Sequence, residues 1–127
     1  MPTPIVLKFE GRELKAELND SPTAAALLRR LPLSVRMSRW GDEYYGDIGG
    51  ALRVEAAPDA RDDMAVGEIA FWIPGNALCI FFGPTPASTG KEPKAASPVN
   101  PVGRVTGDAG VLRKLGSRIV LEVEQEG

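Results

Sequence analysis

The residue types that most often carry catalysis are scarce in this chain of 127 residues. It has no histidine, which removes the commonest general base and the commonest metal ligand. Its one cysteine, Cys79, lies inside an apolar run, so we expect a buried and unreactive thiol. The sequence therefore predicts no metal site and no cofactor.

Aromatic and acidic residues gather in residues 40–47 (WGDEYYGD), between glycines. Aromatic rings supply contact area and carboxylates supply polar anchors, so this stretch predicts a recognition loop. The alternative is a wide hairpin whose aromatic side chains cover one end of a barrel. Asp42, Glu43 and Asp47 could also supply paired carboxylates for hydrolysis, although acids in a glycine-bounded turn are usually only solvated.

A second stretch, residues 67–86 (GEIAFWIPGNALCIFFGPTP), holds two apolar runs around the turn residues Pro74, Gly75 and Asn76. Alternation places apolar side chains on both faces of each run, which predicts a central buried hairpin. The alternative is that Trp72, Phe81 and Phe82 form the floor of a ligand groove.

The elements that must position these residues are mostly short strands. Alternating patterns predict a hairpin over residues 5–18 and further strands at 33–40, 51–55, 102–105 and 119–123. Helix signals mark residues 22–31 and 109–115, residues 60–63 read as a polar connection, and the proline-rich residues 87–101 predict a long surface loop. About eight strands with two helices favour a mostly β barrel or sandwich, and of these we expect a barrel whose ends the helices cover.

Composition limits the classes of partner. The length suits a single domain over residues 1–127, and a formal net charge of −2 argues against nucleic acid or an anionic membrane as partner. One cysteine suits a reducing compartment, and no signal peptide or spanning segment is visible, so we expect a cytoplasmic, soluble protein. The oligomeric state stays open.

Four segments together resemble the prokaryotic cyclophilin-like-domain proteins, whose function is uncharacterised. They are EGRELKAELNDSPTAAALL (10–28), WGDEYYG (40–46), the run 67–86 quoted above, and SPVNPVGRVTGD (97–108). The resemblance covers nearly the whole chain. It implies a closed eight-stranded β-barrel with two short helices at its ends.

True cyclophilins are peptidyl-prolyl isomerases, and part of their groove has a counterpart here. Residues 77–82 are similar to the cyclophilin strand that ends in a Phe-Phe pair, which would place Phe82 in the hydrophobic pocket and Ile80 where a polar residue is expected. Arg39 precedes Tyr44 at a spacing similar to that of the catalytic arginine and the next groove aromatic. The groove histidine and glutamine have no counterpart.

These observations lead to two main hypotheses. The first is a binding module for an unidentified small molecule or peptide, whose groove is lined by Trp40, Asp42, Tyr44, Tyr45, Trp72, Asn76 and Phe82. The second is a weak peptidyl-prolyl isomerase in which Arg39 stabilises the twisted amide. A hydrolase using the acids of residues 42–47, or a partner-binding role for exposed aromatic residues, is a further alternative.

Overall fold

The computed structural model describes residues 1–126, and strands dominate them. In chain order the elements are β1 (Thr3–Phe9), β2 (Arg12–Leu18), α1 (Pro22–Leu28), β3 (Leu33–Arg39), β4 (Glu43–Asp47), β5 (Arg61–Asp63), β6 (Glu68–Trp72), the 3-10 helix η1 (Ile73–Gly75), β7 (Ala77–Phe81), β8 (Lys94–Val105), the 3-10 helix η2 (Ala109–Lys114) and β9 (Arg118–Gln125).

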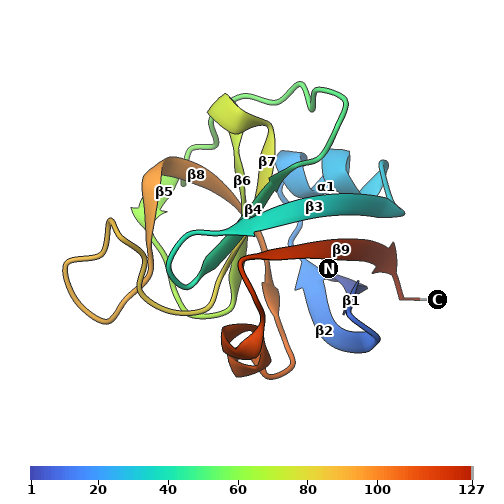
Figure 1. Ribbon diagram of the computed structural model, residues 1–127. Helices are drawn as coiled ribbons and strands as arrows, with labels where there is room; N and C mark the ends of the chain where they lie inside the picture. Colours follow the sequence, from blue (N-terminus) through green and yellow to red (C-terminus); the bar gives the residue numbers. More distant parts are fainter. Residues whose placement is uncertain (127) are drawn as a thin grey trace.

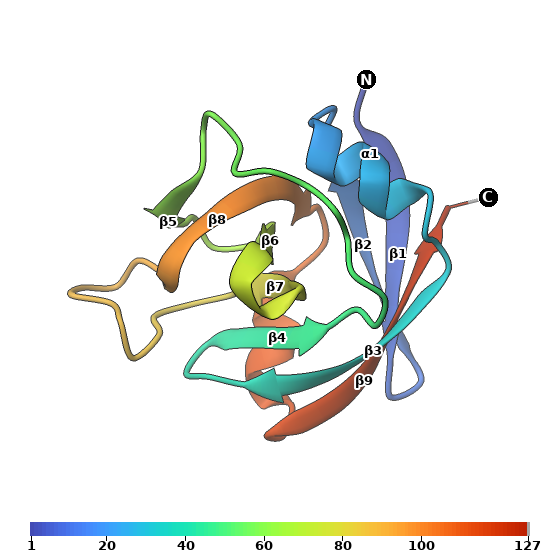
Figure 2. The ribbon, with the colours of Figure 1, turned by 90° about the horizontal axis from the view of Figure 1, so that it is seen from above.

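Eight of the strands close into an antiparallel barrel (Figure 1). The order is β2-β1-β9-β3-β4-β7-β6-β8, and pairing of β8 with β2 joins the two edges, which confirms the expected closed eight-stranded barrel. Strand β5 lies outside this circuit and pairs with the first half of β8. Seen from above, β5 and the half of β8 that pairs with it lie to one side of the other barrel strands (Figure 2).

Local sequence explains how the barrel begins. The β1–β2 turn uses Glu10 and Gly11 at φ 48° and 76°, the left-handed pair that a two-residue hairpin requires. Ser21 caps α1 by accepting a hydrogen bond from the Ala24 amide at 3.2 Å, and Pro22 occupies the first helical position. Helix α1 ends at Leu28, one turn short of the predicted residue 31.

Alternation along the strands divides the apolar side chains between two cores. The barrel core takes Leu78, Ile80 and Phe82 from the β7 segment, together with Leu27 of α1 and Leu112 of η2. A second core lies on the outer face of β6 and β7, under the first half of β8. Its members are Met64, Ala70, Ala77, Cys79, Phe81, Ala95 and Val99, with Trp72 packed against them.

The prediction of a loop over residues 87–101 is wrong for its second half, because β8 begins at Lys94. Prolines normally exclude a segment from a sheet interior, but they are tolerated at irregularities where no ladder donor is needed. Pro98 lies where the β5–β8 register shifts, and Pro101 lies beside the break in the β6–β8 register. These breaks let one strand serve both the barrel and the outer layer.

Three other predicted segments also differ. Residues 51–55 are irregular and not a strand, because side chains satisfy their backbone: Arg30 donates to the Ala51 carbonyl at 2.6 Å, and Asn76 accepts from the Leu52 amide at 2.9 Å. The supposed polar connection contains β5. Residues 43–47 form the barrel strand β4, which pairs with β3, so the hairpin alternative for this stretch holds and the loop does not.

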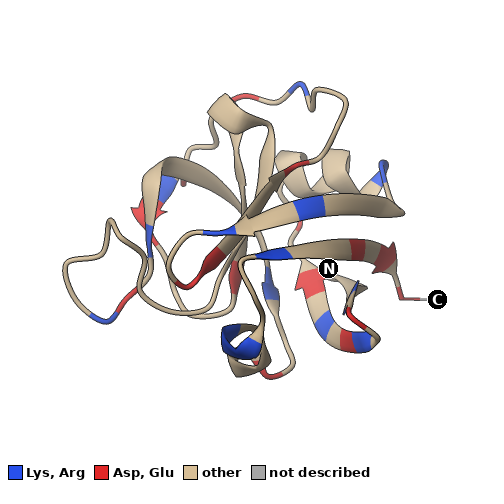
Figure 3. Cartoon of the chain, viewed as in Figure 1, with Lys and Arg blue, Asp and Glu red and all other residues tan. Residues whose placement is uncertain are grey.

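Basic and acidic residues are interspersed along the strands (Figure 3). No helix within residues 1–126 has the length and apolar character needed to cross a membrane.

Candidate functional site

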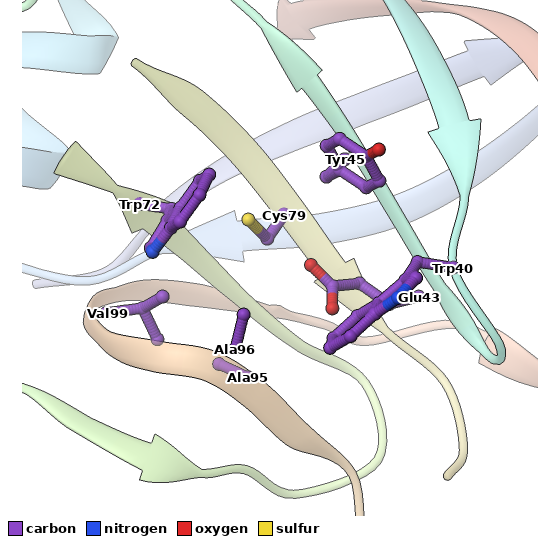
Figure 4. A pocket seen from close by; sticks show the side chains of 8 residues that line it. All are labelled: Trp40, Glu43, Tyr45, Trp72, Cys79, Ala95, Ala96 and Val99. Carbon is purple, nitrogen blue, oxygen red and sulfur yellow. The ribbon is translucent and has the colours of Figure 1, made fainter. Parts of the chain in front are cut away.

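The candidate site is a cavity of about 170 Å³ on the outer face of β4, β7 and β6, beside the first half of β8. Its lining is apolar and aromatic apart from one carboxyl group and one thiol (Figure 4). The lining residues are Trp40, Glu43, Tyr45, Trp72, Cys79, Ala95, Ala96 and Val99. The site thus lies over the second core and outside the barrel.

A tight turn between β3 and β4 places two of these residues side by side. Trp40 and Glu43 exchange backbone hydrogen bonds of 2.8 and 3.2 Å, leaving Gly41 and Asp42 as a two-residue loop. Gly41 has φ +61°, and a Cβ there would come within 2.9 Å of the Thr85 backbone. The glycine therefore allows the turn that brings the Trp40 ring beside the Glu43 carboxylate (Figure 4).

Glu43 is the unusual group in the cavity. It is only 5% exposed, and its Oε1 has no hydrogen-bond partner within residues 1–126. Burial raises the pKa of Glu43 to about 7, and this effect outweighs the opposing effect of Cys79. A buried carboxylate without a partner is costly, so this group stands ready to accept a cation or a hydrogen-bond donor.

The remaining wall residues are held in place by the surrounding chain. The Trp72 indole donates a hydrogen bond of 2.7 Å to Ser97 Oγ, which ties β6 to β8. Cys79 is buried and unpaired, as expected, and burial followed by the nearby Glu43 raises the pKa of its thiol well above its ordinary value. At neutral pH the cavity therefore presents a thiol and not a thiolate.

Only some of the residues predicted to bind a ligand line the cavity. Trp40, Tyr45 and Trp72 line the cavity. Tyr44 and Phe82 do not, because they face the barrel core, where neither ring is exposed to solvent and the two stack with centroids 5.5 Å apart.

Arg39 and Asp42 belong to the Tyr44–Phe82 group and not to the cavity. The Arg39 guanidinium lies 5.0 Å from the Phe82 ring centroid and donates to Asp42 Oδ1 at 2.8 Å. It also donates to the carbonyls of Gly41, Arg113 and Leu115 at 2.8–3.0 Å. These contacts tie η2 to the β3–β4 turn and use four of the five N–H donors of the guanidinium.

Asn76 and Asp47 complete a separate turn. Asn76 has φ 50° at the end of η1, and its side-chain amide donates to Asp47 Oδ1 at 3.0 Å and to the carbonyls of Gly49 and Gly50. Asp47 is four residues from Glu43 along β4, about 13 Å between Cα atoms for an extended strand. The three acids of residues 42–47 therefore have different surroundings: Glu43 lines the cavity, Asp42 accepts a hydrogen bond from Arg39, and Asp47 accepts one from Asn76.

Sequence reasoning did not include Glu43, Cys79, Ala95, Ala96 or Val99 among the ligand-binding residues, although all line the cavity. Period-two alternation would have found Glu43 had residues 43–47 been assigned to a strand, since Glu43 then shares a face with Tyr45. The three β8 residues lay in the supposed loop, and no local signal links them to β7.

Comparison with known proteins gives a consistent result. The family model described as "Cyclophilin-like" matches residues 3–124. The chain is similar to a hypothetical protein from Archaeoglobus fulgidus whose solution structure is known, with 33% sequence identity and a TM-score of 0.79 over 98% of this chain and 95% of that one. A search of curated proteins found no match.

Proposed function

The chain belongs to the cyclophilin-like family, and we propose that it is a small-molecule binding module whose ligand enters the cavity between Trp40 and Trp72. The observation that carries the proposal is the cavity itself, where aromatic side chains and a buried carboxyl group surround one space. Binding sites usually combine apolar walls with a few polar groups that orient the ligand.

The size of the cavity favours a small ligand. Sites for drug-sized molecules commonly occupy roughly 300–1,000 Å³, whereas this cavity has about 170 Å³. That space suits a fragment-sized molecule more than an extended peptide. A cytoplasmic location belongs to the same proposal, because a single cysteine suits a reducing compartment.

The two tryptophans of the chain both line the cavity, so indole signals report on this site alone. We would titrate a mixed panel of neutral, cationic and anionic fragments and follow tryptophan fluorescence and the indole N–H resonances. Binding should shift both indoles and leave the amide resonances of β1 and β9 unchanged.

A variant whose cavity is filled by a larger side chain provides the control for ligand binding. Ala96 is exposed on the cavity rim, so Ala96→Phe should block the space without disturbing the core, whereas Ala25→Phe, also exposed but on α1, should not. Fragment binding that survives Ala96→Phe, or a panel that shifts neither indole in the wild-type protein, would contradict the proposed function.

A further inference from the structure

The cavity combines a carboxylate with aromatic faces and offers no competing cation. Glu43 provides the only carboxyl group of the described lining, and Trp40, Tyr45 and Trp72 provide three rings. Two cationic side chains adjoin lining residues in the sequence, and both form ion pairs outside the cavity. Arg39 pairs with Asp42, and Lys94 pairs with Asp62 and Asp63 at 3.3 and 3.1 Å.

Electrostatic interactions in the cavity favour a positively charged ligand. Aromatic faces attract cations through their quadrupoles, and this attraction strengthens where water is excluded. Glu43 is only 5% exposed, and its Oε1 is unpartnered within residues 1–126. A cation in the cavity would satisfy that oxygen and the ring faces together, whereas an anion would meet repulsion from both.

We propose that the ligand of this cavity is a small organic cation, an alkylated ammonium ion, whose charged group lies among Trp40, Tyr45 and Trp72 with Glu43 as its counter-ion. This inference rests on the proposed binding function and specifies its ligand class. Alkyl groups on the nitrogen match the apolar walls supplied by Ala95, Ala96 and Val99.

Ionisation of Glu43 makes the binding depend on pH. The titratable groups that face it are the Cys79 thiol on β7 and the Tyr45 phenol on β4; the lining residues from β6 and β8 carry none. With the Glu43 pKa near 7, the carboxylate is mostly neutral at pH 6 and mostly ionised at pH 8. We therefore expect cation affinity to rise about tenfold between pH 6 and pH 8.

The test compares choline with its neutral carbon analogue, 3,3-dimethyl-1-butanol, which has nearly the same shape. Titrations at pH 8, followed through the indole resonances, should show choline binding at least about tenfold more tightly to the wild-type protein. Glu43→Gln should reduce this preference to the part that the aromatic rings supply and lower the affinity for choline at least about fivefold. Amide resonances of β1 and β9 that stay at their wild-type positions would report that the variant is folded. Glu122→Gln, the same change at an exposed position of β9, should behave as wild type.

Equal binding of the two compounds, or tighter binding of the neutral one, would overturn the cation assignment and leave the binding function standing. If neither compound binds, the cation assignment is also overturned. The mixed fragment panel then tests the binding function separately. A quaternary ammonium group also occurs on phosphatidylcholine, so vesicles of that lipid form a further arm. Co-sedimentation with vesicles in the absence of choline binding would contradict a free ligand.

Discussion

Two consecutive side chains of β4 point to opposite sides of the barrel wall. Glu43 and Tyr44 are consecutive residues of β4, and pleating points Glu43 to the outer cavity and Tyr44 into the barrel. The Arg39 guanidinium lies over the Tyr44 ring, and the Tyr44 hydroxyl donates a hydrogen bond to the Gly116 carbonyl. We therefore infer that Glu43 contacts the ligand and that Arg39 supports the scaffold.

The Glu43 carboxyl should make stability depend on pH. Its pKa is higher in the folded state than its ordinary value of 4.5, so the folded protein holds more protons between pH 4.5 and 7 and its stability falls as pH rises through this range. A rise to about 7 corresponds to about 3 kcal/mol.

Urea denaturation of wild type and Glu43→Gln at pH 4.5, 6 and 8 measures this effect. The variant should gain stability relative to wild type by about 3 kcal/mol across the range. Glu122→Gln, an exposed change, should give parallel curves. A constant difference between wild type and Glu43→Gln at all three pH values would contradict the burial argument.

Arg39 should act as a structural clamp. Arg39→Ala removes four hydrogen bonds and leaves Asp42 with only the weaker contact to Arg113 at 3.8 Å. We expect a loss of about 2–4 kcal/mol in the free energy of unfolding. Arg36→Ala, at an exposed position of the same strand, should cost less than about 0.5 kcal/mol. Equal effects of the two substitutions would show that the Arg39 contacts are not stabilising.

At the scale of elements, β8 both closes the barrel by pairing with β2 and forms one wall of the cavity. The sequence predicted the β1–β2 hairpin, the β6–β7 hairpin and the capped helix, because each carries a local signal such as Gly11 or Ser21. It did not predict β8, since proline statistics describe regular strands and the register breaks at Pro98 and Pro101 depend on distant partners. For the candidate site, the sequence pointed to Trp40, Tyr45 and Trp72. It did not point to Glu43 on β4, Cys79 on β7 or the three residues from β8 as ligand-binding residues.

Gly103 should be required where β8 is shared between β2 and β6. A Cβ at this position would overlap the Glu17 carbonyl oxygen, which belongs to the β2 backbone and cannot move alone. Gly103→Ala should therefore lower stability by about 1–3 kcal/mol. Gly90→Ala, where a Cβ would meet open space, should be neutral. Thermal or chemical denaturation compares the two, and similar midpoints would refute the close approach.

At the scale of the whole molecule, the outer layer should open more readily than the barrel. Strand β5 has three residues and only two register positions with β8, whereas β3 and β9 share six. Local openings concentrate where such pairing is sparse. Hydrogen exchange should be faster for amides of β5 and residues 94–97 than for those of β3 and β9. Uniform protection would argue against a separable layer over the cavity.

The closed barrel supports a cavity outside it, between Trp40 and Trp72, and we propose that the ligand binds there. A crystal structure of the protein soaked with choline tests this most directly. We expect density for the ammonium group between the two indoles and within contact of the Glu43 carboxylate. Density confined to other surfaces, with Trp40 packed onto Cys79 so that the cavity is closed, would contradict the account.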